Sequence, residues 1–259
     1  MQEETGTENL LVARHLVKRF GDLTAVDDVS LSVRAGEIVG LLGPNGAGKT
    51  TTLNMCIGLL RPTSGEVTVA GMDIARHSRA AKALIGYVPD EPYLYDKLTG
   101  REFVLLMARL YGVRAEAGMR AAELLAYFGV LDAADDLIGG YSHGMKQKIA
   151  VCGMLIHQPR LLFLDEPTVG LDPRSARLLR NTLQQLAREG RGIILCTHIL
   201  DIAQAICHRV AILDHGVIVA EGTMDELRQH VRAESLEDIF LQLTGEDEEQ
   251  LVARSLLAT

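Results

Sequence analysis

The segment 38–53, IVGLLGPNGAGKTTTL, constrains the fold of this chain more than any other part of it. Its first five residues are apolar and predict a buried strand, and the pattern after the lysine predicts a helix. The turn between them matches every fixed position of the phosphate-binding pattern G-x-x-x-x-G-K-[ST], at Gly43, Gly48, Lys49 and Thr50. Strand, glycine-rich turn and helix in this order are the context in which that pattern binds a nucleoside triphosphate.

The physical basis of this prediction is an anion-binding turn. Glycines let consecutive backbone N–H groups point inward, and the start of the next helix adds free N–H groups and a positive dipole end. Lys49 would contact the β- and γ-phosphates, and the Thr50 hydroxyl would bind Mg²⁺. The alternative is a glycine-rich turn with an incidental Lys-Thr pair, which the complete pattern after a strand disfavours. We therefore predict nucleotide contacts from Gly43, Pro44, Asn45, Gly46, Ala47, Gly48, Lys49, Thr50 and Thr51.

The composition narrows the classes of partner. The chain has 259 residues, enough for one large or two small domains with a sizeable core. Its net charge is −8 and its Lys and Arg residues are scattered, which argues against nucleic acid as the main partner. No apolar run reaches about 18 residues, so we expect no segment of the sequence to span a membrane.

Two further features point to an intracellular globular protein. Residues 1–9 are polar and acidic, so we expect them to be disordered rather than a signal peptide. The four cysteines lack metal-ligand spacing and lie in apolar contexts, which is typical of small buried residues in a reducing cytoplasm. A zinc site is the less favoured alternative. These cysteines are Cys56, Cys152, Cys196 and Cys207.

Short apolar or alternating segments separated by helical patterns predict an α/β fold. In such folds the core sheet is mainly parallel and ligands bind at the carboxyl ends of its strands. The first two predicted strands are close in sequence and suggest an antiparallel piece, and the last two flank Asp214-His215-Gly216, a hairpin signal. The predicted strands lie at 10–20, 29–33, 38–42, 67–71, 85–88, 161–164, 193–196, 209–213 and 217–220.

The chain divides into three predicted parts after residues 1–9. The nucleotide-binding domain would occupy residues 10–230, and a helical subdomain at about 91–158 would be inserted within it. Thr99 followed by Glu102 predicts a capping box at the start of the first inserted helix. Residues 231–259 would form a helical, acidic extension at the C-terminus.

Acidic residues follow the apolar strand LLFL at Asp165 and Glu166. Asp165 is well placed to reach Mg²⁺ across the sheet from Thr50, and Glu166 to polarise an attacking water. His198 follows another strand and would face the same edge, where it could contact a γ-phosphate. The alternatives are a turn cap at Asp165, a surface Glu166 and a structural His198.

A second anion site is predicted at the segment YSHGM, residues 141–145, which opens a helix about 20 residues before Asp165. A Ser-x-Gly pattern at a helix start offers a hydroxyl, backbone N–H groups and a helix dipole. The alternative is an N-cap that serves only its own helix. Since one nucleotide rarely needs two such sites from one chain, a head-to-tail dimer is the arrangement that would use both.

With these motifs in this order and spacing, the chain resembles the ATP-binding subunit of a bacterial ABC transporter over nearly its whole length. The resemblance implies a P-loop NTPase fold of the ABC type, with a mixed parallel core sheet, an antiparallel β subdomain and a helical subdomain. It implies that Asp165 binds Mg²⁺, that Glu166 is the catalytic carboxylate and that His198 is the switch histidine. Its D-loop residue is Asp172, and its nucleotide-binding positions include Phe20 and Val26.

Phe20 falls where the family stacks an aromatic ring on adenine, a position more often held by Tyr. Its location at a predicted strand end is compatible with stacking on a base. The alternative is a core phenylalanine that closes the sheet.

Two motifs depart from the family pattern. Asp90 replaces the Q-loop glutamine, and we expect it still to reach Mg²⁺ or water through its carboxylate, with a shorter arm and a charge. The signature LSGGQ is replaced by YSHGM, which keeps two residues and changes three. We expect Ser142, His143, Gly144 and Met145 still to form a working signature toward the ATP of a partner. The alternative is a slowly hydrolysing site that pairs with a different ATP-binding subunit.

The resemblance implies a motor that binds ATP and Mg²⁺. Two chains, as a homodimer or a heterodimer, would enclose two ATP molecules and drive a separately encoded membrane permease from the cytoplasmic face. The ending LEDIFLQLTGED resembles a subgroup that often exports hydrophobic compounds, and residues 91–95 would receive a coupling helix of the permease. The alternative is a soluble ABC-type scaffold or regulator. A P-loop kinase is disfavoured by the signature and by Glu166 with His198.

Overall fold

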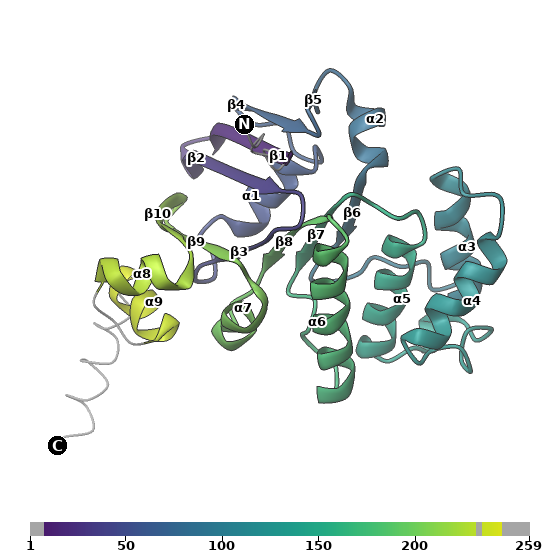
Figure 1. Cartoon of the computed structure of the whole chain (residues 1–259). Coiled ribbons are helices and arrows are strands. Elements are labelled where there is room, and N and C mark those ends of the chain that lie inside the picture. Colours follow the sequence, from purple (N-terminus) through teal and green to yellow (C-terminus); the bar gives the residue numbers. More distant parts are fainter. Residues whose placement is uncertain (1–7, 232–234, 245–259) are drawn as a thin grey trace, which may run out of the picture.

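A computed structural model describes residues 8–231 and 235–244 of the chain (Figure 1). The sequence predicts disorder for residues 1–9, and residues 1–7 of that range lie outside the described residues. Much of the predicted C-terminal extension lies outside them as well, beyond Thr244. Within the described residues, no helix combines the length and the apolar character that crossing a bilayer requires.

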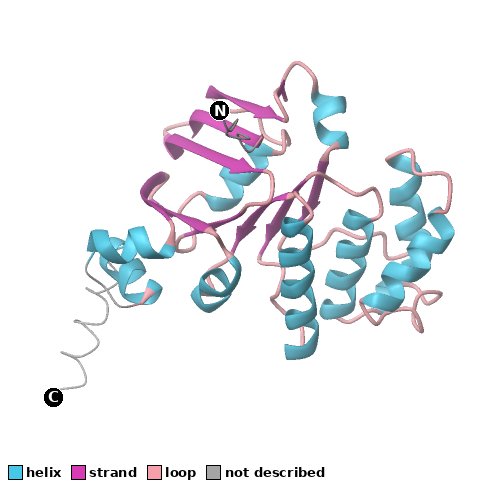
Figure 2. Cartoon of the chain, in the orientation of Figure 1, coloured by secondary structure: helices cyan, strands magenta, loops and turns pink. Residues whose placement is uncertain are grey.

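The structure contains two sheets (Figure 2). The smaller sheet is antiparallel and has the order β2-β1-β4-β5. The larger sheet has the order β10-β9-β3-β8-β7-β6, in which all neighbours are parallel except the β9–β10 hairpin. The strands are β1 (Asn9–Phe20), β2 (Leu23–Arg34), β3 (Ile38–Leu42), β4 (Ser64–Val69), β5 (Met72–Asp73), β6 (Ile85–Val88), β7 (Leu161–Asp165), β8 (Gly192–Cys196), β9 (Arg209–Asp214) and β10 (Val217–Gly222).

The predicted fold class is confirmed, since the parallel core, the antiparallel piece and the hairpin are all present. The prediction was wrong about the extent of the second strand, which begins at Leu23 rather than at residue 29. The tight turn at Gly21 and Asp22 joins it directly to β1, and Asp28 has a positive φ of 55° that interrupts the alternation in the middle of the strand. The alternation of apolar and polar residues in the sequence stops there, although the strand continues.

The helices cover both faces of the core sheet. Helix α1 lies between the two sheets and α2 lies beside β5 and β6, while α3 to α9 lie on the opposite side of the core sheet or at its β9–β10 end (Figures 1 and 2). The short helices α2 and α7 are absent from the prediction. The helices are α1 (Lys49–Cys56), α2 (Ser78–Ala83), α3 (Gly100–Leu110), α4 (Ala117–Tyr127), α5 (His143–Leu155), α6 (Pro173–Arg188), α7 (Leu200–Ile206), α8 (Met224–Val231) and α9 (Leu236–Thr244), with a 3₁₀ turn η1 (Ile138–Gly140).

Local hydrogen bonds explain where several helices begin. The predicted capping box is confirmed at α3, where the Thr99 hydroxyl accepts from the Glu102 N–H and the Glu102 carboxylate accepts from the Thr99 N–H. At α6, the Asp172 carboxylate accepts from the N–H groups of Arg174 and Ser175 at 3.0 Å each. Pro173 follows as the first helical residue, where a missing N–H costs nothing.

The core sheet is buried on both faces, which is why its strands are continuous apolar runs. Along β7, Leu162 and Leu164 pack with the residues of α3, α5 and α6, whereas Leu161 and Phe163 pack toward α1 and the antiparallel sheet. Each such side chain contributes roughly 1.5–3 kcal/mol relative to an exposed position. A third, smaller core joins β9 and α7 to α8 and α9 through residues such as Phe240.

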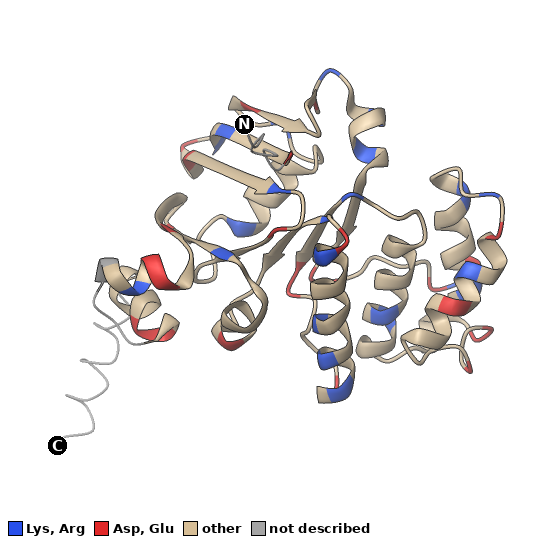
Figure 3. Cartoon of the chain, in the orientation of Figure 1, with Lys and Arg blue, Asp and Glu red and all other residues tan. Residues whose placement is uncertain are grey.

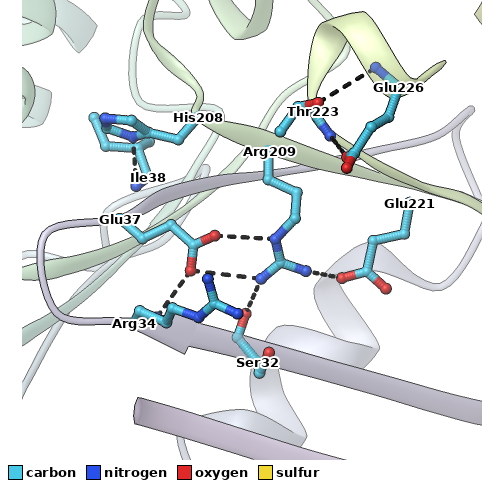
Figure 4. Close-up of polar contacts among 9 residues, drawn as sticks. All are labelled: Ser32, Arg34, Glu37, Ile38, His208, Arg209, Glu221, Thr223 and Glu226. Carbon is cyan, nitrogen blue, oxygen red and sulfur yellow. Dashed lines mark hydrogen bonds and ion pairs between the residues drawn. The ribbon is translucent and has the colours of Figure 1, made fainter. Parts of the chain in front are cut away.

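A group of charged side chains fastens the sheets together at the amino ends of β3 and β9 (Figure 4). The Arg209 guanidinium donates from Nε to Glu37 Oε1 at 2.9 Å and from Nη2 to the Ser32 carbonyl at 2.7 Å, and it also pairs with Glu221. We call Ser32, Glu37, Arg209 and Glu221 the Arg209 cluster. It connects β2, β3, β9 and β10 at the end of β3 that is opposite the glycine-rich turn.

Lys and Arg residues are spread along the described elements and are interspersed with Asp and Glu (Figure 3). The densest run of one sign is on α6, which contains four arginines and no acidic residue. Several other cations form surface ion pairs, such as Arg101 with Asp135 at 2.8 Å.

Candidate functional site

The glycine-rich turn follows β3 and leads into α1, as the sequence predicts. Gly48, the N-cap of α1, has φ of +104°, and a Cβ there would lie 2.6 Å from the Ala25 carbonyl oxygen. A Cβ on Gly43 would lie 2.1 Å from the Leu213 carbonyl oxygen. A side chain at either position would therefore collide with backbone, which gives the physical reason for glycine at both ends of the turn.

Lys49 is buried and lies along the turn that precedes it. Its ammonium donates to the carbonyl oxygens of Gly43 at 2.6 Å and Pro44 at 2.9 Å. These acceptors are neutral, and no carboxylate of the described residues forms an ion pair with Lys49. The ammonium therefore keeps its full charge available at the mouth of the turn, where a phosphate oxygen would be a stronger acceptor than a carbonyl.

Thr50 and Asp165 bring the turn and the end of β7 together. The Thr50 hydroxyl donates to Asp165 Oδ2 at 2.9 Å, and the Asp165 side chain is almost completely buried. Burial raises the pKa of Asp165; the Thr50 hydrogen bond opposes that rise, and the nearby carboxylates of Glu166 and Asp90 add to it. This is a hydroxyl and a carboxylate with excess negative charge around them, a donor set that suits a hard divalent cation such as Mg²⁺.

Glu166 is held by the end of the neighbouring strand β8. Its Oε2 accepts from the Thr197 hydroxyl at 3.0 Å, while Oε1 accepts from the His198 backbone N–H at 2.8 Å and lies 2.7 Å from His198 Nδ1. Its backbone has φ of +46°, a left-handed conformation that costs a non-glycine residue on the order of 1–3 kcal/mol. Both the strained backbone and the three contacts fix where this carboxylate lies.

A cavity of about 310 Å³ opens over these groups. It is lined by Ala25, Asn45, Gly46, Gly48, Lys49, Thr50, Thr51, Asp90, Asp165 and Glu166. The structure thus brings the glycine-rich turn, both carboxylates of the β7 end and Asp90 to one place. Ala25 and Thr197 are absent from the sequence prediction, and nothing in their local pattern distinguishes them from ordinary strand residues.

Phe20 and Val26 do not line this cavity. Phe20 ends β1 about half exposed, with the Lys18 ammonium 5.0 Å from the centre of its ring. Val26 has no exposed surface, and its Cγ2 lies 3.4 Å from the position of a Cβ on Gly48. In this conformation Val26 is packed against the turn, and its expected contact with a nucleotide stays a prediction.

The signature segment lies apart from the cavity. The Ser142 hydroxyl accepts from the Met145 N–H at 3.3 Å and caps α5, so the helix-capping role is present. His143 is exposed, and neither it nor Ser142, Gly144 or Met145 lines the cavity around Lys49. Asp172 caps α6 and lies 3.8 Å from the Lys148 ammonium. Within one molecule, the signature segment therefore does not contribute to the cavity around Lys49.

Comparisons with known proteins agree with this geometry. The family model described as "ABC transporter" matches residues 26–169. The linearmycin resistance ATP-binding protein LnrL of Bacillus subtilis (strain 168) is 40% identical over 96% of this chain and 80% of its own length. The doxorubicin resistance ATP-binding protein DrrA of Mycobacterium tuberculosis (strain CDC 1551 / Oshkosh) is 38% identical over 90% of this chain and 69% of its own length.

Solved structures show the same likeness. A structure titled as the ATP-binding subunit of an ABC transporter superposes with a TM-score of 0.86 at 34% identity, covering 90% of this chain and 99% of that one. A dimeric ATP-binding cassette in a post-hydrolysis state, bound to ADP and Pi, superposes with a TM-score of 0.76 at 25% identity, covering 83% of this chain and 98% of that one.

Proposed function

Because the chain belongs to the ABC transporter family and is an ATP-binding, ATP-hydrolysing subunit of it, we propose how its residues divide the work. Lys49 and the turn around it bind one ATP, Glu166 assists its hydrolysis, and Ser142 with Gly144 of a second subunit completes the site. Closure of this dimer around two ATP molecules drives a separate membrane permease. The observation that carries the proposal is that, within one chain, the signature segment does not contribute to the cavity around Lys49.

The contacts around the cavity support specific roles in ATP binding and hydrolysis. Lys49 exchanges two neutral carbonyls for phosphate oxygens, which strengthens its hydrogen bonds because the acceptor becomes charged. Glu166 polarises the attacking water and takes up its proton. His198 and Thr197 orient that carboxylate through the contacts they already make, so it needs little reorganisation at the moment of reaction.

Mg²⁺ fits the donor set of this cavity. Thr50 and Asp165 would hold it, and Asp90 lines the same cavity and would act on it directly or through water. The ion would neutralise the phosphate charge, and it would offset both the burial that raises the pKa of Asp165 and the nearby carboxylates that add to that rise.

A groove beside the cavity supports a permease-docking surface. It has a volume of about 490 Å³ and includes Leu59, Tyr93 and Glu91, together with Thr50 and Asp165 of the ATP site. Tyr93 is 89% exposed and Leu59 is 65% exposed, so this groove presents two large apolar side chains together, a surface that a partner would cover. A helix of the permease in this groove would therefore contact residues one step away from the bound nucleotide.

The relatives favour export as the direction of transport. Those named above are described as resistance proteins for linearmycin and doxorubicin. We propose that this chain likewise powers removal of a hydrophobic compound, acting at the cytoplasmic face of the membrane. The permease decides the identity of that compound, so the chain itself is expected to show no specific affinity for it.

ATP-dependent dimerisation tests the central proposal. With Mg²⁺ and ATP, Glu166→Gln should elute as a stable dimer in size-exclusion chromatography with light scattering, because the closed state forms but is not reset by hydrolysis. The same variant carrying Ser142→Arg should remain monomeric at equal ATP occupancy. A dimer that persists in that double variant would contradict the assignment of Ser142 to the partner's ATP.

Capture from membranes tests the partner. In detergent extracts of the native host, the tagged full chain should recover an integral membrane protein, and Tyr93→Ala should lose most of it. Tyr127→Ala removes a tyrosine on α4 that is 51% exposed and lies outside this groove, and it serves as the control. Recovery of the chain only in complexes without a membrane protein would favour the scaffold alternative.

A further inference from the structure

The first turn of α5 lies directly against the loop 167–171 that joins β7 to α6. A Cβ on Gly170 would lie 2.2 Å from Cδ2 and 3.0 Å from Nε2 of His143, so the imidazole rests on the Gly170 backbone. A Cβ on Gly144 would lie 2.8 Å from the Gly170 carbonyl oxygen. The two segments are therefore packed at backbone distance, and His143 supplies the side chain of that contact.

The loop connects Glu166 to the start of α6 through two consecutive turns. The Val169 N–H donates to the Glu166 carbonyl at 3.1 Å, and the Leu171 N–H donates to the Thr168 carbonyl at 3.2 Å. Gly170 has φ of +74° and Glu166 has φ of +46°, so both turns depend on left-handed residues. In such a short, tightly turned segment, a displacement at Gly170 changes the backbone that orients the Glu166 carboxylate.

The same contact region contains polar groups that this conformation leaves without partners. Gln147 is fully buried, and neither its amide oxygen nor its amide nitrogen has a hydrogen-bond partner among the described residues. It lies one turn after His143 and Gly144 on the same face of α5. The Thr168 hydroxyl, in the loop itself, is also buried and unpartnered. A buried polar group without a hydrogen-bond partner costs free energy. A shift of the two segments that gave these groups partners would therefore be favoured.

We propose that His143 is a positioning residue that makes the signature turn and the Glu166 loop move as one body. In the closed dimer of the proposed function, on which this inference rests, Ser142 and Gly144 face the ATP of the partner, whereas Glu166 acts on the ATP of its own chain. The His143–Gly170 contact therefore transmits the seating of one ATP to the hydrolytic carboxylate of the other. The glycine that His143 replaces has no side chain with which to do this.

The contact itself can be tested without nucleotide. In the full-length His143→Gly variant, the amide hydrogens of residues 168–171 should exchange at least tenfold faster than in the wild type, as measured by hydrogen–deuterium exchange with mass spectrometry. Peptides from α3 should be unchanged. His143→Phe fills the same space and should restore slow exchange. Unchanged exchange in His143→Gly would overturn the proposal, whether or not the chain hydrolyses ATP.

The coupling of the two sites is tested by steady-state ATP hydrolysis. His143→Gly should lower kcat about tenfold with little change in KM, and the Hill coefficient for ATP should fall toward 1. His143→Phe should recover both, since the role is packing. If Lys restores activity and Phe does not, the side chain acts by its charge on the partner's phosphate, and the positioning role is wrong. A Glu166→Gln variant that still turns over would instead mark failure of the proposed function.

A double-mutant cycle separates this contact from general damage. Gly170→Ala alone places a methyl group against the His143 ring and should lower kcat at least as much as His143→Gly. In the combined variant the ring is gone, so the further loss caused by Gly170→Ala should be at least threefold smaller than in the wild-type background. Strictly multiplicative losses would show that the two residues act independently and would overturn the proposal.

Discussion

The two ends of the central strand β3 carry opposite kinds of charged site. At its carboxyl end, Lys49 meets only neutral carbonyls, and Asp165 is buried near further carboxylates. At its amino end, Arg209 has Glu37, Glu221 and a backbone carbonyl as partners. The charges at the carboxyl end lack matched partners within the described residues, and a triphosphate with a cation would provide them. The Arg209 cluster has its partners and fastens four strands together.

This difference separates binding from stability within one sheet. Charges without partners raise the free energy of the ligand-free chain but are ready to bind, as expected of a site assembled for a ligand. Charges with partners affect the stability of the fold, because removing one member of a buried ion pair leaves the other charge buried without a partner. Variants at the two ends should therefore affect different measurements, and each prediction below tests whether that separation is real.

Lys49→Ala should give the largest effect. Loss of hydrogen bonds to charged phosphates should weaken ATP binding roughly 10- to 100-fold, and loss of a cation at the transferred phosphate should lower turnover at least about 100-fold. Isothermal titration with ATP and a phosphate-release assay measure the two quantities. The thermal midpoint without nucleotide should hardly change. Lys97→Ala, at an exposed lysine, is the control, and equal losses in both variants would contradict the argument.

Arg209→Met should reverse this pattern. Removing the central cation leaves Glu37 and Glu221 mostly buried beside each other, which should lower the free energy of unfolding by about 3 kcal/mol. Urea denaturation measures this loss, and ATP affinity should be preserved at temperatures where the variant is folded. Arg209→Lys keeps the charge but not the planar guanidinium, so its free energy of unfolding should lie between those of the wild type and Arg209→Met. A large loss of ATP affinity in folded Arg209→Met would show that the two ends are not separate.

Thr197→Val probes a residue that joins strand β8 to the hydrolytic carboxylate. Thr197 is fully buried and donates to Glu166 Oε2 at 3.0 Å, so Val should leave one carboxylate oxygen without that donor. Turnover should fall about tenfold while ATP affinity stays within twofold, because the interaction orients Glu166 rather than the nucleotide. Thr182→Val, at another buried threonine on α6, is the control. A fall in affinity that matches the fall in turnover would place Thr197 in binding instead.

The sequence predicted the placement of the catalytic-type residues better than their contacts. Parallel strands end at a common edge, so the strands that lead into Thr50, Asp165 and His198 bring those residues near one another. That rule locates a residue but not the direction of its side chain. The bonds from Thr197 and His198 to Glu166 depend on a left-handed backbone at Glu166, which no local pattern of residue types specifies.

The errors in the predicted fold also arise where the local sequence does not specify the structure. The first half of β2 contains Asp27 and Asp28, whose charges disguise a strand that tertiary pairing with β1 nevertheless extends. Helices α2 and α7 have six and seven residues, too few for a clear helical period. Long apolar strands and strongly capped helices were predictable because local preference and burial agree in them.

Glu221→Gln should have the smallest effect, and its sign is informative. Burial raises the pKa of Glu221, with Glu37 adding to the rise and Arg209 opposing it. The folded chain therefore holds a proton on Glu221 over a pH range above 4.5 in which the unfolded chain has lost it. Over that range the stability of the wild type must fall as the pH rises, since the folded state binds more protons. Urea denaturation between pH 4 and pH 7 should show this loss for the wild type relative to Glu221→Gln. If the difference instead grows in favour of the wild type as pH rises, the ion pair with Arg209 outweighs burial, and the Arg209 cluster is held together more by charge than by packing.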